Sequence, residues 1–346
     1  MHPASFPIPL IITHIRDEVS QVKTFTLATA SGEPLIYRAG QFLTFSFRLG
    51  TTEERRSYSV SSSPALQELL AITVKRVDNG AFSRWLIDAA KVGDTLVCTG
   101  IAGLFTLPDP ADNQHILLFA AGIGITPMFS LIKEFIATTA GGSLTLIYSN
   151  RSPDEAVFIH ELLELEQQSA GRLIIEWLYS NHKQLLRARL TRSVMDELMQ
   201  KYLRNASTAL AYICGPADYR WLVQLLLEET GIPAGQIRQE IFITERNTIL
   251  QAPPDKTPHQ VQLYYLGQVY TFTAQYPDTI LMAAQKAGIT LPYSCRAGRC
   301  SSCAAQCTKG KVWMAYNEVL TEKDQEHGLI LTCTGYVVDG DVTIRL

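Results

Sequence analysis

The spacing of the cysteines limits how the C-terminal part of this 346-residue chain can fold. The chain has seven cysteines, an odd number, and four of them crowd into residues 295–307, with Cys333 further along the chain. Crowded cysteines in a chain without a secretory signal indicate metal ligands or redox groups before disulfides. A tight loop and a distant segment must therefore converge on one centre.

Cys295-x4-Cys300-x2-Cys303, followed at a distance by Cys333, is the spacing of plant-type [2Fe–2S] proteins. Two irons need four thiolates around a compact rhomb, and three ligands from one loop with one from a distant strand can supply them. The sequence therefore predicts a [2Fe–2S] cluster on these four cysteines. A structural zinc site and inert buried thiols are the alternatives, although zinc sites usually combine a CxxC with a second CxxC or with histidines, which this segment lacks.

Small residues in the cysteine loop permit its backbone to wrap closely around a cluster. They are Ala297, Gly298, Ser301 and Ser302, and Gly298 is free to take dihedral angles that other residues avoid. Because the bridging sulfides of a cluster need donors, we expect the loop to expose backbone N–H groups. Cys307 fits no ligand position and is expected in the core of the following strand, and Cys98 is expected in the core as well.

Length, charge and apolar runs exclude several classes of protein. At roughly 150 residues per domain, the chain has two or three domains. The formal net charge of −3 argues against nucleic acid as the main partner, since duplex binding relies on basic surface. No apolar run reaches the roughly 18 residues of a membrane span, and residues 1–9 lack the features of a secretory signal. We therefore expect a cytoplasmic protein without membrane or nucleic-acid partners.

Residues 1–108 alternate apolar and polar side chains, which is typical of half-buried strands. The pattern covers Phe25 to Leu27, Leu43 to Phe47 and Ile72 to Val74, and turn signals such as Asp78-Asn79-Gly80 separate the runs. Several short strands with turns favour a small barrel or sandwich, and we expect an antiparallel β-barrel domain.

Residues 109–246 alternate apolar strands with helices, which predicts an α/β domain with a parallel sheet and helices on both faces. The expected strands are Ile116–Ala120, Leu144–Tyr148, Leu173–Leu178, Ala209–Cys214 and Ile237–Phe242. The expected helices are Pro127–Thr138, Phe158–Gln168, Ser193–Leu203 and Ala217–Glu229.

Residues 247–259 hold three prolines and little apolar character, so they are predicted to form a semi-extended linker. Residues 260–346 form the third predicted domain. It begins with a hairpin around Gly267, and a helix over Thr279–Ala287 ends at Gly288. The cysteine loop and short strands follow.

The tetrapeptide Arg56-Ser57-Tyr58-Ser59 follows a predicted strand and has the chemistry to contact a flavin. A tyrosine ring can stack on an isoalloxazine plane, an arginine can pair with a pyrophosphate, and a serine hydroxyl can reach the reactive edge. Taken alone, the tetrapeptide is better explained as an edge-strand arginine beside a half-buried tyrosine.

With its context, the tetrapeptide resembles the flavin signature of the ferredoxin–NADP reductase superfamily. The second flavin segment follows, as Val74-Lys75-Arg76-Val77 and then Gly80-Ala81-Phe82-Ser83, and Gly103-Leu104-Phe105 stands where that family has a Gly-x-Phe element. Residues 80–83 predict a loop entering a helix, with Ser83 as its N-cap and its N-terminus suited to a flavin pyrophosphate. The resemblance implies a flavin, with FAD favoured over FMN.

Ala120-Ala121-Gly122-Ile123-Gly124-Ile125-Thr126-Pro127 resembles the nicotinamide-nucleotide element of the same family. Gly122 and Gly124 permit a tight turn close to a pyrophosphate, while Thr126 is expected to cap the following helix and Pro127 to begin it. Cys214-Gly215-Pro216 lies at the carboxyl edge of the predicted sheet, and the resemblance implies that the cysteine borders the hydride path. Arg151 could serve NADH or NADPH, and Ser180-Asn181-His182-Lys183 departs from the usual 2′-phosphate pattern, so both nucleotides stay open.

Residues 261–346 resemble a plant-type ferredoxin domain of the β-grasp fold. The order of the three domains is most similar to reductase subunits of phenylacetyl-CoA epoxidases, and reductases of ketosteroid hydroxylases and of hybrid-cluster proteins share it. The resemblance implies electron transfer from NAD(P)H through FAD and the cluster to an oxygenase or another metalloprotein, with Tyr58, Ser59 and Cys214 at the hydride step. No general acid or base is expected. A redox-inactive binding protein on the same fold is the alternative of another class.

Overall fold

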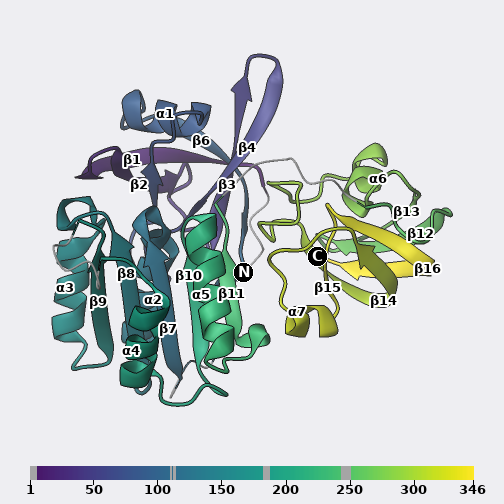
Figure 1. Cartoon of the computed structure of the whole chain (residues 1–346). Helices are drawn as coiled ribbons and strands as arrows, with labels where there is room; N and C mark the ends of the chain where they lie inside the picture. Colours follow the sequence, from purple (N-terminus) through teal and green to yellow (C-terminus); the bar gives the residue numbers. More distant parts are fainter. Residues whose placement is uncertain (1–5, 110, 112–113, 182–187, 243–250) are drawn as a thin grey trace. The chain divides into compact units, whose positions relative to one another are not determined.

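The computed structural model describes residues 6–109, 111, 114–181, 188–242 and 251–346. They form two compact units, Met1–Glu240 and Ile241–Leu346, which are described separately (Figure 1). Residues 247–250 of the predicted linker, together with His182 and Lys183, lie outside the described residues. No helix in the described part of the chain is long and apolar enough to cross a membrane.

The first unit begins with a six-stranded antiparallel sheet in the order β4-β3-β6-β1-β2-β5. Its strands are β1 (Ile8–Val19), β2 (Val22–Thr29), β3 (Phe42–Leu49), β4 (Thr52–Ser59), β5 (Ala71–Lys75) and β6 (Thr95–Ala102), with helix α1 (Ala81–Asp88) before β6. A bridge between Val60 and Ile72 joins the two outer strands, and this closure makes the predicted barrel. Alternate side chains such as Leu10, Ile12 and Cys98 are fully buried inside it, as the period of two predicts.

The second part of the first unit is a five-stranded parallel sheet in the order β11-β10-β7-β8-β9. The strands are β7 (His115–Ala121), β8 (Ser143–Asn150), β9 (Leu173–Tyr179), β10 (Leu210–Cys214) and β11 (Ile237–Glu240). The chain passes from β7 to β8 on one side and returns to β10 on the other. This reversal marks the position, beyond the carboxyl ends of β7 and β10, where such sheets bind ligands.

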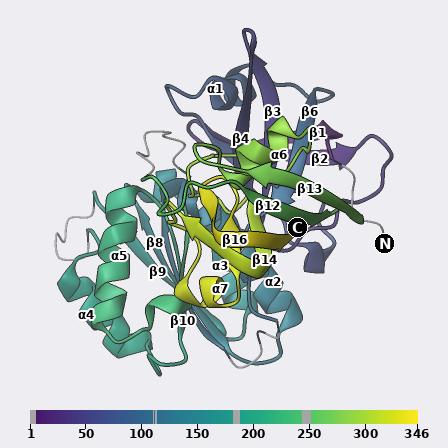
Figure 2. The ribbon, with the colours of Figure 1, turned by 90° about the vertical axis from the view of Figure 1, so that its right-hand side faces the viewer.

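Helices cover both faces of the parallel sheet, as predicted (Figure 2). Leu118 and Ala120 of β7 pack with α2 (Ile125–Thr138) and α3 (Ile159–Gln168), whereas Leu117 and Phe119 pack with α4 (Arg192–Tyr202) and α5 (Ala217–Glu229). Both faces of β7 are therefore apolar, which explains its uninterrupted hydrophobic sequence.

The second unit is a five-stranded mixed sheet in the order β13-β12-β16-β14-β15. Its elements are β12 (His259–Tyr265), β13 (Gln268–Ala274), α6 (Ile280–Lys286), β14 (Ala304–Met314), α7 (Glu322–Glu326), β15 (Leu329–Leu331) and β16 (Gly335–Arg345). Strands β12 and β16 are parallel and the other pairs are antiparallel. Thr279 caps α6, and Gly288 follows it with φ +78°. His259 belongs to β12 rather than to the linker, because its backbone pairs with Ala274.

Candidate active site and iron–sulfur loop

Three strand ends meet at the point where the parallel sheet reverses. Cys214 ends β10 and pairs in register with Ala120 of β7 and with Glu240 of β11. The turn after β7 presses against this position, since a Cβ on Gly124 would lie 2.2 Å from the carbonyl oxygen of Cys214. Gly122 has φ +53° with open space around it. The turn therefore needs Gly124 for packing and Gly122 for its backbone angle.

The predicted start of α2 is wrong by a few residues. Gly122–Gly124 forms a 3₁₀ turn, so Gly124 is the N-cap, Ile125 is the first helical residue, and Thr126 and Pro127 lie inside the first turn. Thr126 cannot cap the helix because its hydroxyl donates to the Ile123 carbonyl at 3.1 Å. The N-terminus of α2 still faces the carboxyl edge of the sheet, where a pyrophosphate would be favoured.

A buried hydrogen bond joins the barrel to the parallel sheet at this edge. Ser59, the last residue of β4, donates from Oγ to Oε1 of Glu240 at 3.0 Å. Both side chains are buried, and Oε2 of Glu240 has no hydrogen-bond partner among the described residues. Burial raises the pKa of Glu240 to about 8, and the bond from Ser59 opposes this only in part.

Sequence reasoning missed Glu240, whose side chain the structure places beside Ser59 at the end of β11. The two bonded residues are 181 positions apart, so no local pattern relates them. No local signal singled it out, because Glu240 follows Arg238 and Gln239 in a strand whose residues are mostly polar.

Cys214 is fully buried at the centre of this group. Burial raises the pKa of its thiol, the carboxylate of Glu240 raises it further, and the nearby Arg220 guanidinium lowers it. The thiol is therefore neutral at physiological pH, and Cys214 offers a polarisable surface rather than a nucleophile.

The flavin segment places Arg56 and Tyr58 next to α1. The Tyr58 ring lies 6.0 Å from that of Phe82, which stacks at 4.5 Å on Phe47 and at 5.8 Å on Trp85. Burial raises the pKa of Tyr58, so the phenol stays neutral. Arg56 donates to Glu54 at 3.1 Å, a carboxylate with which a bound phosphate would compete.

Ser57 and the segment Val74–Arg76 are also predicted to bind the flavin. Ser57 Oγ lies 2.9 Å from Thr44 Oγ1 on the opposite face of β4 from Tyr58. Val74 is buried and Lys75 is exposed, while Arg76 pairs with Asp78 and Asp88. The structure thus brings Arg56, Tyr58 and Phe82 together but not the side chains of β5.

The predicted cap of α1 is also wrong. Gly80 is the N-cap and Ala81 the first helical residue, whereas Ser83 lies within the first turn. Its Oγ donates to the Gly80 carbonyl at 3.1 Å and accepts from the Val77 amide at 3.2 Å. Ser83 therefore shapes the loop before the helix, and no side chain caps the amides at the start of α1.

Arg151 stands apart from the hydride site, directly after β8. Its side chain is 78% exposed and lies 3.8 Å from Glu155. The amide of Asn181 donates to the Arg151 carbonyl at 3.0 Å, so the residues that follow β8 and β9 lie side by side. Gly215 and Pro216 continue from Cys214 into α5, for which Pro216 is the N-cap.

The four predicted cluster ligands converge in the second unit. The amide of Cys295 donates to the sulfur of Cys300 at 3.4 Å, and Sγ of Cys295 accepts from the amides of Ala297 at 3.4 Å and Arg299 at 3.5 Å. Cys333 follows Thr332, whose amide donates to the Cys303 carbonyl at 3.1 Å. The loop thus exposes N–H groups towards its sulfurs, as predicted.

The thiols also interact with one another. Hydrogen bonds from the Cys300 and Cys333 thiols lower the pKa of Cys295, and a bond from Cys333 lowers that of Cys303. Thiols that are linked in pairs and served by amide donors fit the ligands of a two-iron cluster.

Cys307 is half-buried on β14, not in the core, and its thiol donates to the Lys309 carbonyl at 3.4 Å. The irregular pairing between β14 and β16 at this point leaves the side chain near the surface.

The groups at the carboxyl edge fit the predicted cofactors. The unpartnered oxygen of Glu240 is a buried polar atom that a flavin or nicotinamide could satisfy. The helix starts at α1 and α2 suit phosphates. Tyr58 and Phe82 offer aromatic surface between them, and the cysteine loop offers soft ligands.

Comparison with known proteins agrees with this arrangement. Residues 9–107 match the oxidoreductase FAD-binding domain family, residues 118–220 the oxidoreductase NAD-binding domain family, and residues 264–338 the 2Fe-2S iron-sulfur cluster binding domain family.

Curated relatives match the chain over nearly its whole length. The chain is 33% identical over 343 residues to the ferredoxin reductase component of 3-ketosteroid-9-alpha-monooxygenase from Mycobacterium tuberculosis, covering 94% of this chain and 92% of the relative. It is 28% identical to the glycine betaine monooxygenase reductase subunit of Pseudomonas aeruginosa, with the same coverage. The solved structure of phthalate dioxygenase reductase, described as a modular structure for electron transfer from pyridine nucleotides to [2Fe-2S], aligns over 98% of both chains with a TM-score of 0.59 and 25% identity.

Proposed function

Because this chain belongs to the family of FAD- and NAD-binding ferredoxin reductases that carry a C-terminal 2Fe-2S domain, we propose that it supplies electrons to an oxygenase component. A bound flavin would supply two-electron hydride chemistry, and a cluster held by the four cysteines would supply one-electron chemistry. The observation that carries the proposal is the convergence of Ser59, Cys214 and Glu240 at the reversal point of the parallel sheet.

The side chains at this edge act by position and by excluding water. Tyr58 provides a neutral aromatic face, and Ser59 is held by Glu240 so that its hydroxyl oxygen faces a fixed direction. Glu240 holds a proton near neutral pH because of its raised pKa, so it can donate or accept at Oε2. The backbone carbonyl of Cys214 packs against the turn at Gly124, and its buried thiol stays neutral because burial raises its pKa.

The four cysteines are proposed to carry the one-electron step. The amides of Ala297 and Arg299 would stabilise negative charge on the sulfur of Cys295. Hydrogen bonds to cluster sulfurs raise the reduction potential of such centres, so these amides would favour electron arrival.

The most specific part of the proposal is which oxygenase receives the electrons. The order of the three domains suggests a phenylacetyl-CoA epoxidase, while relatives at 33% identity serve a 3-ketosteroid-9-alpha-monooxygenase. We favour an oxygenase of the second type, because that likeness extends over nearly the whole chain. Adding purified oxygenase components of each type to the reductase and measuring product formation with NADH and with NADPH would choose between them.

Cys300→Ser tests whether the cluster carries the one-electron step while the flavin accepts the hydride. We expect the variant to lose one-electron reduction of cytochrome c by at least tenfold, because a cluster lacking one thiolate is not assembled. Reduction of ferricyanide by the flavin should remain within about twofold of the wild-type rate, because Cys300 lies in the other unit.

Cys307→Ser is the matched control, since Cys307 lies in the following strand and is not a predicted ligand. It should retain both activities. Unchanged cytochrome c reduction in Cys300→Ser would contradict the ligand assignment, and a colourless wild-type protein would instead favour a redox-inactive binding protein.

A further inference from the structure

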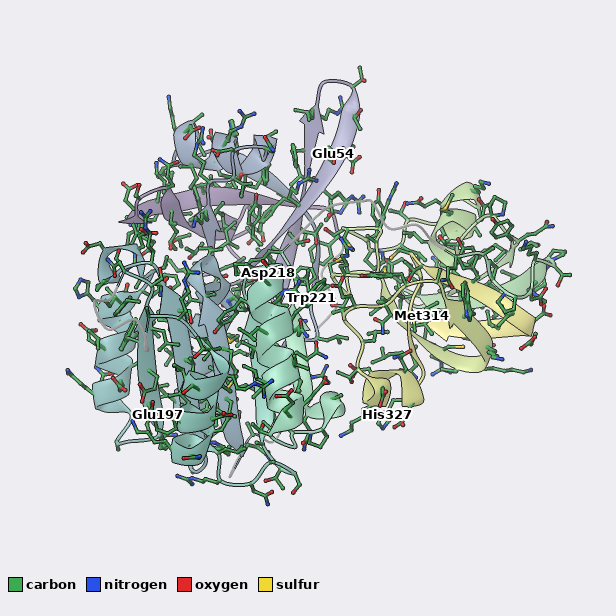
Figure 3. The ribbon with its side chains drawn as sticks, in the orientation of Figure 1. Glu54, Glu197, Asp218, Trp221, Met314 and His327 are labelled. Carbon is green, nitrogen blue, oxygen red and sulfur yellow. The ribbon has the colours of Figure 1, made fainter. Side chains whose placement is uncertain are left out.

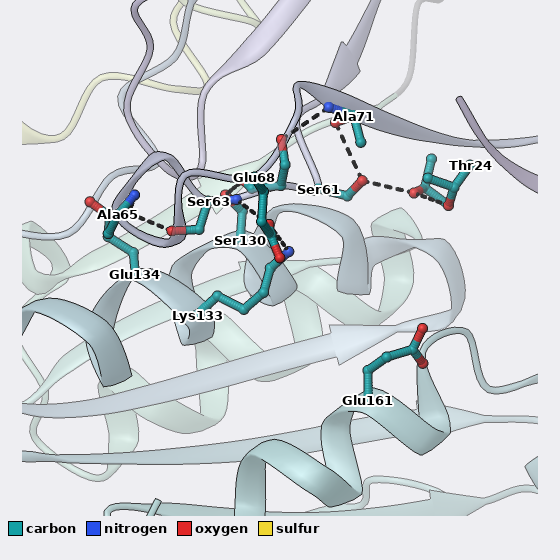
Figure 4. A network of polar contacts seen from close by, with 12 residues as sticks. Thr24, Ser61, Ser63, Ala65, Glu68, Ala71, Ser130, Lys133, Glu134 and Glu161 are labelled. Carbon is teal, nitrogen blue, oxygen red and sulfur yellow. Dashed lines mark hydrogen bonds and ion pairs between the residues drawn. The ribbon is translucent and has the colours of Figure 1, made fainter. Parts of the chain in front are cut away.

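The loop over residues 60–70 connects the two barrel strands that carry the predicted flavin residues. It leaves β4 directly after Ser59 and enters β5 at Ala71, and it contains a short 3₁₀ turn, η1 (Pro64–Leu66). Helix α2 packs against this loop (Figure 4). The same helix begins at the Gly122–Gly124 turn, so one rigid element contacts both the nucleotide turn and the flavin loop.

Three consecutive polar contacts attach α2 to the loop, and we call them the α2 clamp. Ser130 donates to the Ser62 carbonyl at 2.6 Å. The Ser63 hydroxyl donates to Glu134 at 2.7 Å. Lys133 donates to Glu68 at 2.5 Å, and the same Glu68 oxygen accepts from the Ser63 amide at 2.7 Å.

Lys133 is an unusual residue for a helix that packs into a core. Its side chain is only 7% exposed, and its ammonium lies 4.2 Å from the centre of the Phe129 ring. Glu68 is 33% exposed. Taking a lysine out of water is costly, and an apolar side chain of similar length could fill the space. The Lys133–Glu68 pair therefore contributes little to the free energy of unfolding. Its main effect is to fix the position of the loop on α2.

We propose that Lys133 and Glu68 are positioning residues for hydride transfer, which hold the flavin segment Arg56–Ser59 at a fixed distance from the nucleotide turn. This inference rests on the proposed function, since it assumes that a flavin and a nicotinamide meet at Ser59 and Cys214. Neither residue touches the reacting groups. They act through the loop that begins next to Ser59 and through the helix that begins next to Gly124.

Lys133→Met in the full-length, cofactor-loaded protein removes the charge and keeps most of the packing on Phe129. We expect the rate of flavin reduction by NADH, measured by anaerobic stopped flow at saturating NADH, to fall by about ten- to a hundredfold, because small displacements of reacting groups have effects of this size. The Kd for NADH and the flavin content should stay within about twofold, and Lys133→Arg should recover part of the rate.

Glu68→Gln provides a second route, because Glu68 is partly exposed and its loss should leave folding intact. The double variant should be no slower than the slower single variant, since both remove the same contact. Tyr212→Phe is the matched control. The Tyr212 hydroxyl donates to the Thr106 carbonyl at 2.8 Å, so it also links the parallel sheet to the segment that follows the barrel strands, but not through the flavin loop.

Wild-type reduction rates in both Lys133→Met and Glu68→Gln would overturn the inference. An equal loss in Tyr212→Phe would also overturn it, because the loss of any link between the two parts would then have the same effect. If the wild-type protein itself does not transfer hydride from NADH or NADPH to a flavin, the proposed function fails instead.

Discussion

Glu240 is a carboxyl group in surroundings that favour its neutral form. Water is excluded from it, the hydrogen bond from Ser59 compensates one oxygen, and the other has no partner in the described part of the chain. A negative charge on Glu240 would also oppose ionisation of the adjacent Cys214 thiol. Burial therefore favours the protonated state of both acids, and a charge on Glu240 would favour the protonated thiol further.

Glu240→Gln should change how the stability of the first unit depends on pH. The folded-state pKa of about 8 lies above the ordinary value of 4.5. Between these values the unfolded chain binds fewer protons, so the free energy of unfolding should fall as pH rises, by up to about 1.4 kcal/mol per pH unit. The amide cannot ionise, so Glu240→Gln should lose this slope in melting curves recorded from pH 5 to pH 8.

Glu197→Gln is a suitable control, because Glu197 lies on the exposed side of α4 (Figure 3). It should reproduce the wild-type slope. Parallel curves for the wild type and Glu240→Gln would mean that Glu240 is ionised in the folded protein.

The cysteine loop is an element held by backbone angles as much as by its sulfurs. Arg296, Gly298 and Ser301 have φ of +54°, +72° and +51°, the left-handed region that side chains disfavour. Gly298 is also confined sterically, since a Cβ there would lie 2.6 Å from the Tyr316 carbonyl oxygen. The loop curls around its sulfurs because these residues turn it.

Gly298→Ala should impair cluster assembly, because the added carbon would collide with the backbone carbonyl of Tyr316. We expect the iron content per chain to fall below half of the wild-type value, together with the visible absorbance of the cluster. Gly288→Ala is the matched control. It has φ +78° and open space around it, so it should cost about 1 kcal/mol in stability and keep its iron. Equal iron contents in the two variants would contradict this account of the loop.

The sequence predicts the elements of this protein better than their ends. Both alternation patterns identify their sheets correctly, because burial follows the period of the side chains. The caps are wrong at Ser83 and Thr126, since a hydroxyl near a helix start can bond to the preceding loop instead. The cysteine spacing is a local pattern and could be recognised, whereas the bond between Ser59 and Glu240 depends on how two sheets meet.

At the scale of the whole molecule, each unit has its own hydrophobic interior. The clusters in the first unit contain only residues up to Ile237. In the second unit, Val261, Leu263 and Ile344 are among the fully buried side chains. A unit with its own core can unfold as a separate cooperative body.

Leu263→Ala and Leu146→Ala should therefore affect different transitions. Both side chains are fully buried, so each change should cost about 2–5 kcal/mol in its own unit. On heating, Leu263→Ala should lower the midpoint temperature at which cluster absorbance is lost. Leu146→Ala should lower the midpoint temperature at which flavin fluorescence rises. If either change moved both midpoints equally, the units would unfold as one.

The short strand β11 is the last element of the first unit, and Glu240 is its last residue. Synthesis from the N-terminus therefore completes the barrel, the nucleotide turn and Cys214 before the partner of Ser59 exists. The hydrogen bond between Ser59 and Glu240 can therefore form only after the rest of the first unit has been synthesised, and it can form before the cysteines of the second unit exist.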